Sequence, residues 1–248
     1  MTERRKTPIE LKHVPAHMCS TDLRLEILSR VPFFAVLPPH DLAKVNQRFH
    51  EKGFSAEEYI YYEGDPAFSL FVVADGRVKL IRHTVSGKDV MLDLLTPGEF
   101  FGSLSHLEQE LNAETAQAQT NACILTIEKS EFHKILDSFP GVAMAVLEIT
   151  SRRLNAAQEM IRQISAYSVE KRLAFTLLRL ADKFGKNSDV GLLIEVPLSR
   201  DDLAQMTGTT TESASRVLSQ FHKQGLIESG RQWIAVTDRL ALERLAGD

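Results

Sequence analysis

The sequence lacks the features that define several large classes of protein. It has only two cysteines, Cys19 and Cys123, which are too few for a disulfide framework or for a site of four thiolates. No apolar run approaches the ~20 residues that a membrane-spanning helix needs, and the charged first residues are not followed by the apolar run of a secretory signal. The net charge of −4 gives no basic field for non-specific binding to nucleic acid. We therefore expect a soluble, cytoplasmic protein without membrane attachment.

A regular series of glycines marks the first half of the chain. They recur at intervals of 11 or 12 residues, at Gly53, Gly64, Gly76, Gly87 and Gly98. Short runs rich in β-branched and aromatic residues lie between them, at 54–62, 68–73, 78–84 and 90–95. Short strands at regular spacing, each followed by turn residues, predict an antiparallel sandwich or barrel. We expect a jelly-roll-like antiparallel β-roll over about 33–129, with a further strand pair within 114–127.

Helical segments are predicted on both sides of this roll. Before it, 21–28 and 39–49 are expected to form short helices, and the first 20 residues, charged and unpatterned, a flexible tail. After it, apolar residues repeat every seven positions with smaller or apolar residues between them, at Leu147, Leu154 and Ile161 and at Thr150, Ala157 and Ile164. Such a seam is typical of a helix that pairs with a second copy. The alternative is that the seam packs on the roll.

The last third of the sequence predicts a helix-turn-helix followed by a hairpin. A helix over 168–184, a loop over 185–189 and a short strand over 192–196 precede it. Ser199 stands three residues before Asp202, a capping-box-like helix start, and this helix should end at Thr207–Gly208. A second start follows at Thr209–Glu212, with a helix that ends at Gln224–Gly225. Two short helices joined by a tight glycine turn form a helix-turn-helix, and 226–236 has the pattern of a wing.

The second of these helices has side chains suited to reading DNA. Glu212 and Arg216 are four residues apart and share a helix face; Arg can donate twice to guanine, and Glu can accept from cytosine. Ser215 lies beside them, and Arg200 at the start of the first helix is suited to a phosphate. The alternative is that Glu212 is only a capping acid, or only an ion-pair partner of Arg216. The predicted DNA-binding residues are Arg200, Thr209, Thr210, Thr211, Glu212, Ser213, Ser215 and Arg216.

These segments together resemble one family. The matching runs are EGDP at 63–66, LFVV at 70–73, GRVK at 76–79, LTPGEFFG at 95–102, SRDDLA at 199–204 and TESASR at 211–216. Their order and spacing resemble the Crp/Fnr superfamily of bacterial transcription factors over about residues 23–245. The resemblance implies an α+β protein: a cyclic-nucleotide-binding-type β-roll, a long dimerisation helix and a winged helix-turn-helix. The expected domains are 1–20 for the tail, 21–139 for the roll, 140–166 for the dimerisation helix and 167–248 for the DNA-binding domain.

The resemblance also implies partners. It predicts a homodimer that binds an inverted repeat of double-stranded DNA and cooperates with RNA polymerase. The reader, formed by Glu212, Ser215 and Arg216, resembles that of the Fnr branch and implies TTGA-like half-sites.

The effector pocket of the family is altered in this sequence. Ser103 stands where cyclic-AMP-binding members have a glutamate for the ribose, and Ala113 and Glu114 stand where they have an arginine and a serine or threonine for the cyclic phosphate. Loss of the guanidinium removes a bidentate phosphate anchor, and Glu114 would repel a phosphate. We therefore expect a degenerate pocket, formed by Gly102, Ser103, Leu104, Ala113 and Glu114, that does not bind cyclic AMP in the usual way.

Other sensor chemistries have little support in the sequence. An iron–sulfur cluster needs more cysteines than Cys19 and Cys123 provide, and we expect Cys123 to be a core residue on a strand. His13, His17 and Cys19 have a metal-like spacing, but they fall in the predicted tail. We expect no metal and no cofactor, while a haem-sensing or redox-sensing member of the family stays open because one His can ligate haem and Cys19 is a thiol.

Two other classes of function are alternatives to a transcription regulator. A ligand-binding regulatory module without a role in gene control is the first, and the complete winged helix argues against it. An enzyme of the cupin type is the second; it needs clustered metal ligands on the roll, and the sequence there has no His-x-His pair. We expect no catalysis.

Overall fold

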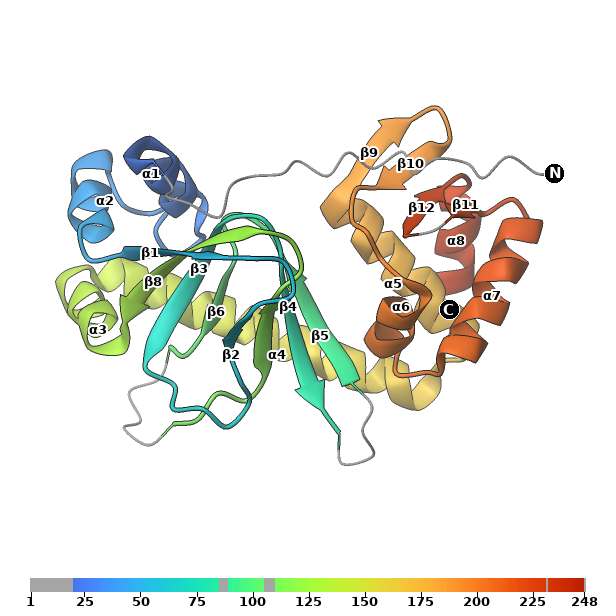
Figure 1. Cartoon of the computed structure of the whole chain (residues 1–248), viewed down its shortest axis with the longest axis horizontal. Coiled ribbons are helices and arrows are strands. Elements are labelled where there is room, and N and C mark those ends of the chain that lie inside the picture. The colour runs from blue at the N-terminus through green and yellow to red at the C-terminus, as the bar shows by residue number, and fades with distance from the viewer. Residues whose placement is uncertain (1–19, 85–88, 105–109, 231, 248) are drawn as a thin grey trace. The chain divides into compact units, whose positions relative to one another are not determined.

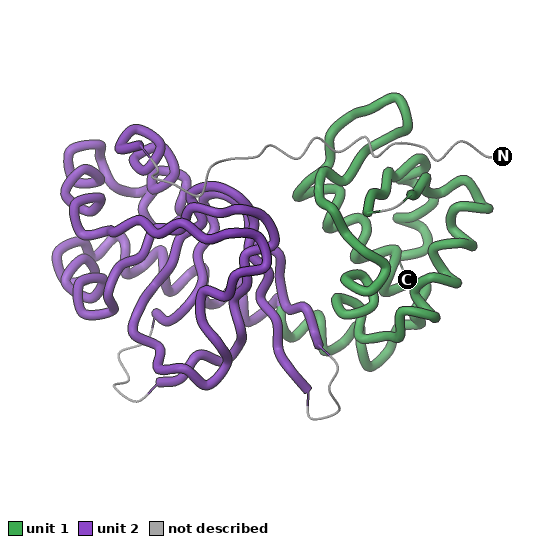
Figure 2. The backbone as a smooth tube through the Cα atoms, in the orientation of Figure 1, with its two compact units in different colours: residues 1–12, 157–248 green, residues 13–156 purple. Residues whose placement is uncertain are grey.

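The computed structural model describes residues 20–84, 89–104, 110–230 and 232–247 (Figure 1). These residues fall into two compact units that divide between residues 156 and 157 (Figure 2). Each unit is described by itself. Among the described residues, no helix combines the length and the apolar character needed to cross a bilayer.

The first unit is built on two antiparallel sheets. Its strands are β1 (His50–Phe54), β2 (Tyr59–Tyr61), β3 (Ser69–Asp75), β4 (Val78–His83), β5 (Asp89–Leu95), β6 (Phe100–Gly102), β7 (Thr115–Ala118) and β8 (Ala122–Glu128). One sheet has the order β1-β8-β3-β6 and the other β2-β7-β4-β5. The predicted antiparallel roll is confirmed, and with the helices around it the fold class is α+β.

Successive residues of a strand point to opposite faces of its sheet. In this unit one face packs in the interior between the two sheets, and the other packs against helices. In β3, Val73 faces the interior with Phe54, Tyr61 and Phe101. Leu70 and Val72, on the other face, pack against the helices α1 (Thr21–Arg30), α2 (Pro39–Asn46), α3 (Lys129–Ser138) and the start of α4 (Pro140–Ala166). The helices therefore close the outer face of one sheet, while the two sheets close the interior.

Cys123 lies in β8 and belongs to the helix-side core, where it is 8% exposed. The prediction of a core residue on a strand is confirmed. Cys123 is also disulfide-bonded. The other cysteine, Cys19, lies outside the described residues, as do His13 and His17.

The second unit packs the helices α5 to α8 with a four-stranded sheet. Its elements are α5 (Val169–Phe184), β9 (Gly185–Ser188), β10 (Gly191–Ile194), α6 (Arg200–Thr207), α7 (Thr211–Lys223), β11 (Ile227–Gly230), β12 (Trp233–Val236) and α8 (Arg239–Ala246). The sheet order is β11-β12-β10-β9. The predicted helix-turn-helix is α6 and α7, and the predicted wing is β11 and β12.

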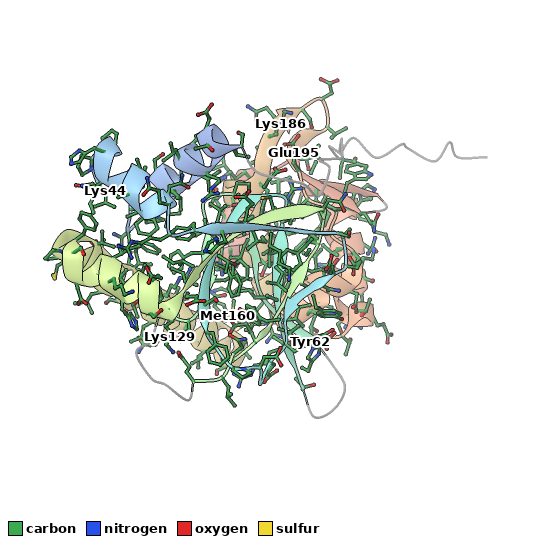
Figure 3. The ribbon with its side chains drawn as sticks, turned by 60° about the vertical axis from the view of Figure 1, so that its left-hand side comes forward. Lys44, Tyr62, Lys129, Met160, Lys186 and Glu195 are labelled. Carbon is green, nitrogen blue, oxygen red and sulfur yellow. The ribbon has the colours of Figure 1, made fainter. Side chains whose placement is uncertain are left out.

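Several boundaries differ from the prediction. The run 54–62 is not one strand: β1 ends at Phe54 and β2 begins at Tyr59, with Glu57 between them at a φ of 67°. The segment 185–189 is not a loop, because 185–188 form β9, whose exposed Lys186 pairs with Glu195 at 3.1 Å (Figure 3). The helices α3 and α8 were not predicted.

Candidate nucleic-acid interface and roll interior

The first helix of the helix-turn-helix begins as predicted. Ser199 is the N-cap of α6, and its hydroxyl accepts a hydrogen bond from the backbone N–H of Asp202 at 3.0 Å. The Asp202 carboxylate in turn accepts from the backbone N–H of Ser199 at 2.8 Å. This reciprocal capping box satisfies two backbone donors at once. The helix ends at Gly208, whose φ of 60° is the left-handed conformation that glycine adopts without a steric cost.

The second helix begins one residue later than the prediction. Thr210, rather than Thr209, is the N-cap of α7, and its hydroxyl accepts from the backbone N–H of Ser213 at 3.2 Å. The third helical position is therefore Ser213, and Glu212 is not the acid of a capping box. That alternative role for Glu212 is wrong, because three consecutive threonines offer the same capping chemistry and the turn at Gly208 selects among them.

The exposed side of α7 presents the predicted reading residues. Glu212 and Arg216 are both exposed, and within the described residues no ion pair joins them. The alternative of an ion pair on the surface of α7 therefore has no support in the structure. The opposite side of α7 is buried through Ala214, Val217, Leu218 and Phe221. Burial of one face thus holds the other face, with its charged groups, toward solvent.

Two hydrogen bonds join the starts of α6 and α7. Arg200 Nη1 donates to the backbone oxygen of Ser215 at 3.0 Å, and the Thr211 hydroxyl donates to the Asp201 carboxylate at 2.6 Å. Of the predicted set, Arg200 is thus bonded directly to Ser215, and Thr211 is bonded to Asp201, the neighbour of Arg200. Sequence reasoning assigned no role to Asp201, the second residue of α6; its place in the first turn of that helix is the one signal that could have suggested it.

A cavity of about 320 Å³ lies beside this joint. Its lining comes from both helices and the wing, with the polar residues Ser199, Arg200, Ser229 and Gln232 among the apolar ones. At the wing, a Cβ on Gly230 would lie 2.2 Å from the indole nitrogen of Trp233. Glycine is therefore required there, because the buried indole occupies the space of a side chain.

The predicted effector-pocket residues of the roll are engaged in internal contacts. Gly102 has a φ of 83°, and a Cβ on it would lie 2.7 Å from the backbone oxygen of Ser69. Ser103 is buried, and its hydroxyl donates to the carboxylate of Glu110. Glu110 also pairs at 3.2 Å with Lys129, the first residue of α3, which Figure 3 labels. Leu104 packs against the helix-side core.

The other two predicted pocket residues differ from each other. Ala113 is exposed, whereas the Glu114 carboxylate accepts a hydrogen bond from the Tyr61 hydroxyl at 2.9 Å. The Tyr61 ring lies among the rings of Phe71 and Phe101, with centroids 5.4 and 6.0 Å away. Burial raises the pKa of Tyr61, and the negative charge of Glu114 raises it further. Tyr61 is therefore a proton donor to Glu114 at every physiological pH.

The predicted seam of α4 does not pack on the roll. Its large apolar members, Leu147, Leu154, Ile161 and Ile164, are between 51% and 66% exposed, and Thr150 and Ala157 are exposed as well. The alternative that this seam covers the roll is therefore wrong. The residues of α4 that do pack on the helix-side core are Val142, Ala145, Val146 and Ile149.

No cluster of three or more His, Cys, Asp or Glu side chains that could hold a metal ion occurs within the described residues. The candidate sites are thus the exposed face of α7 and the interior of the roll.

Each of the two units contains a segment that matches a known domain family. A model of the cyclic nucleotide-binding domain matches residues 51–139, and a model of the Crp-like helix-turn-helix domain matches residues 171–245. The chain is 28% identical over 215 residues to the cyclic AMP receptor protein of Thermus thermophilus, covering 87% of this chain and 96% of that protein. It is 27% identical over 192 residues to the transcriptional activator protein FnrA of Stutzerimonas stutzeri, covering 77% of this chain and 78% of that protein.

The fold comparison agrees with these matches. The solved structure of FixK2 from Bradyrhizobium japonicum has a TM-score of 0.71 and 25% sequence identity, covering 81% of this chain and 98% of that one. The roll, the long helix and the winged helix-turn-helix thus occur here in the order found among known transcription regulators. The chain belongs to the Crp/Fnr family, and it is a transcription regulator with a DNA-binding helix-turn-helix.

Proposed function

We propose that this regulator binds an inverted repeat of TTGA-like half-sites as a homodimer, without cyclic AMP and without a metal or other cofactor. The exposed first half of α7 carries the proposal, because Glu212 and Arg216 are presented to solvent without an ion pair between them. A recognition helix contacts base edges with its N-terminal residues, and these two side chains match cytosine and guanine.

The exposed seam of α4 supports the homodimer. Apolar residues at heptad spacing are stabilised when a second helix covers them, and the small Thr150 and Ala157 permit close approach. In a twofold dimer, two copies of α7 would enter successive major grooves roughly one helical turn apart, about 34 Å. An inverted repeat is the DNA sequence with the same symmetry.

The interior of the roll supports independence from cyclic AMP. A phosphate at Glu114 would meet a carboxylate that Tyr61 already satisfies, and Ala113 offers no guanidinium. Like charges in a partly buried site repel strongly. We also propose that the regulator acts with RNA polymerase, as FnrA, a transcriptional activator by name, supports, and that it has no catalytic activity.

The test is fluorescence anisotropy of labelled DNA at one fixed salt concentration, because the affinity depends on salt. The probes are an inverted repeat of TTGA half-sites and a scrambled duplex. Arg216→Ala is compared with Lys223→Ala, which removes one positive charge from the far end of the same helix. We expect tight binding of the repeat without ligand, lost in Arg216→Ala and retained in Lys223→Ala. An affinity that rises on addition of cyclic AMP would contradict the effector-independent function.

A redox-sensing regulator is the second candidate, since Cys123 is disulfide-bonded. The same anisotropy measurement with and without dithiothreitol separates the two candidates. A change in affinity on reduction that is absent in Cys123→Ala would favour the redox sensor, and equal affinity in both states would favour the first proposal.

A further inference from the structure

Helix α4 contacts the roll along a single line of side chains. Val142 is fully buried, and Ala145, Val146 and Ile149 pack on the helix-side core. A step of four residues from Ile149 leads to Arg153 on the same helix face. Residues 151–158 are all exposed, Arg153 included. Arg153 nevertheless contacts the roll through Phe100, and it ends this line of contacts.

Arg153 contacts strand β6 in two ways. Its Nη2 donates to the backbone oxygen of Phe100 at 2.9 Å, and its guanidinium carbon lies 3.8 Å from the centroid of the Phe100 ring. A guanidinium over an aromatic face is attracted by the ring, and the attraction is stronger when water is excluded. Phe100 is only 3% exposed, so the contact is shielded from water on the Phe100 side, while Arg153 is exposed in part.

The roll surrounds the guanidinium with negative charge. Burial lowers the pKa of Arg153, while the carboxylates of Asp93, Glu99 and Glu114 oppose that shift. Two of these carboxylates are held in place by the roll itself: Glu114 accepts from Tyr61 at 2.9 Å, and Glu99 accepts from the backbone N–H of Thr96 at 2.8 Å. Arg153 is itself exposed in part, and the nearby carboxylates and its hydrogen bond to Phe100 compensate the side of the guanidinium that faces the roll.

We propose that Arg153 is the positioning residue that fixes α4 on the roll in the absence of any effector. The inference rests on the proposed effector-independent function. The Phe100 that Arg153 holds is followed directly by Phe101 and then by Gly102, Ser103 and Leu104, so one side chain of α4 is tied to the segment that forms the predicted pocket. The same helix carries the exposed seam on an adjoining face, where Thr150 and Ala157 lie one turn before and one turn after Arg153, so Arg153 sets how the seam is presented to a second copy.

The full-length chain offers a matched control for this inference. Arg152 is the neighbouring residue, its side chain is 70% exposed, and it pairs along the helix surface with Glu148. Arg153→Met keeps the bulk of the side chain without its charge, Arg153→Lys keeps the charge, and Arg152→Met makes the same change of residue outside the contact. Three quantities are measured: affinity for the TTGA repeat without ligand, dissociation of the dimer by sedimentation, and hydrogen exchange of the β6 amides.

We expect Arg153→Met to weaken DNA binding and dimer formation at least tenfold and to speed β6 exchange at least tenfold. Arg153→Lys should recover more than half of each loss on a logarithmic scale, because the charge is restored, and Arg152→Met should lie within twofold of the parent chain. Loss in Arg153→Met without recovery in Arg153→Lys would overturn the role of the charge, and so would a Met variant that behaves as the parent.

The test remains decisive if the proposed function fails. A parent chain that does not bind the repeat without ligand contradicts effector independence at once. Hydrogen exchange of β6 then still decides the role of Arg153, since faster exchange in Arg153→Met alone supports the contact and equal exchange in both Met variants overturns it. Thermal unfolding of every variant verifies that the roll is folded.

Discussion

The polar side chains at the two candidate sites differ: those of the roll form hydrogen bonds within the protein, whereas those of the winged helix are exposed. In the roll, Ser103 donates to Glu110 and Tyr61 donates to Glu114, so the predicted pocket residues bond to the protein itself. In the winged helix, Glu212 and Arg216 stand exposed on α7 without an ion pair between them. A polar group satisfied inside the protein contributes to folding, whereas an exposed one can exchange water for a ligand. The comparison indicates that recognition of external chemistry is concentrated in the winged helix.

The largest effect is expected from the aromatic interior of the roll. Phe101 is 1% exposed and stacks on Phe71 with centroids 5.1 Å apart. Phe101→Ala should lower the free energy of unfolding of the roll by about 3–5 kcal/mol, because a buried ring is replaced by a cavity. Urea unfolding measures this, with Leu92→Ala, at an exposed position of β5, as the control. A loss below about 1 kcal/mol would show that the interior is open rather than packed.

Substitution of Glu212 on the exposed side of α7 should change the DNA-sequence specificity without changing the stability of the fold. Glu212→Ala removes a predicted acceptor for cytosine and should cost about 1–3 kcal/mol of discrimination at one base pair of the half-site. Binding to a set of single-base variants of the repeat measures this. Thermal unfolding should stay unchanged, since Glu212 is exposed. A uniform loss over all sequences would instead assign Glu212 to the fold.

The burial of Tyr61 in the roll predicts that the stability of the fold decreases at high pH. Because the folded state raises the pKa of Tyr61, the unfolded chain loses this proton near pH 10 while the folded chain keeps it. Stability is therefore complete below about pH 10 and falls above it, by up to about 1.4 kcal/mol per pH unit for one proton. Tyr61→Phe removes this contribution, and its stability should fall less steeply. Parallel curves for the two proteins from urea unfolding at pH 9 to 11 would mean that Tyr61 is accessible to water.

The smallest effect separates two adjacent threonines. Thr210→Ala removes the N-cap of α7 and should lower stability by about 1 kcal/mol, whereas Thr209→Ala should change it by less than about 0.5 kcal/mol. Thermal unfolding of the two variants decides which hydroxyl caps the helix. The reverse order would restore the assignment of the cap to Thr209 and return Glu212 to a capping position.

Much of the fold could be predicted because its turns depend on local chemistry. Gly64, Gly76 and Gly98 have φ values of 85°, 80° and 91°, a conformation that favours glycine, so their spacing indicated where strands end. The strand β9 could not be found in this way. Its residues, GKNS, are all exposed, and only backbone pairing with β10 makes them a strand.

The sequence predicts those parts of the candidate sites that depend on neighbouring residues, and it does not predict contacts between residues far apart in the chain. The position of Glu212 and Arg216 on one face follows from helix geometry alone. The contact of Tyr61 with Glu114 and that of Arg153 with Phe100 each join residues 53 apart in the sequence. Such a contact leaves no periodic pattern in the sequence, because its partners are far apart along the chain and come together only when the chain folds.

The length of α4 affects how the amount of dimer would depend on the concentration of the protein. The 27-residue helix is about 40 Å long at 1.5 Å per residue, and its contact with the roll ends at Arg153, so the apolar seam beyond that point is exposed in a single copy. If a second copy is needed to bury the seam, mass action makes the DNA-binding species grow with the square of the protomer level when the protein is dilute. A twofold change in synthesis would then give up to a fourfold change in dimer, a steep response that needs no small molecule.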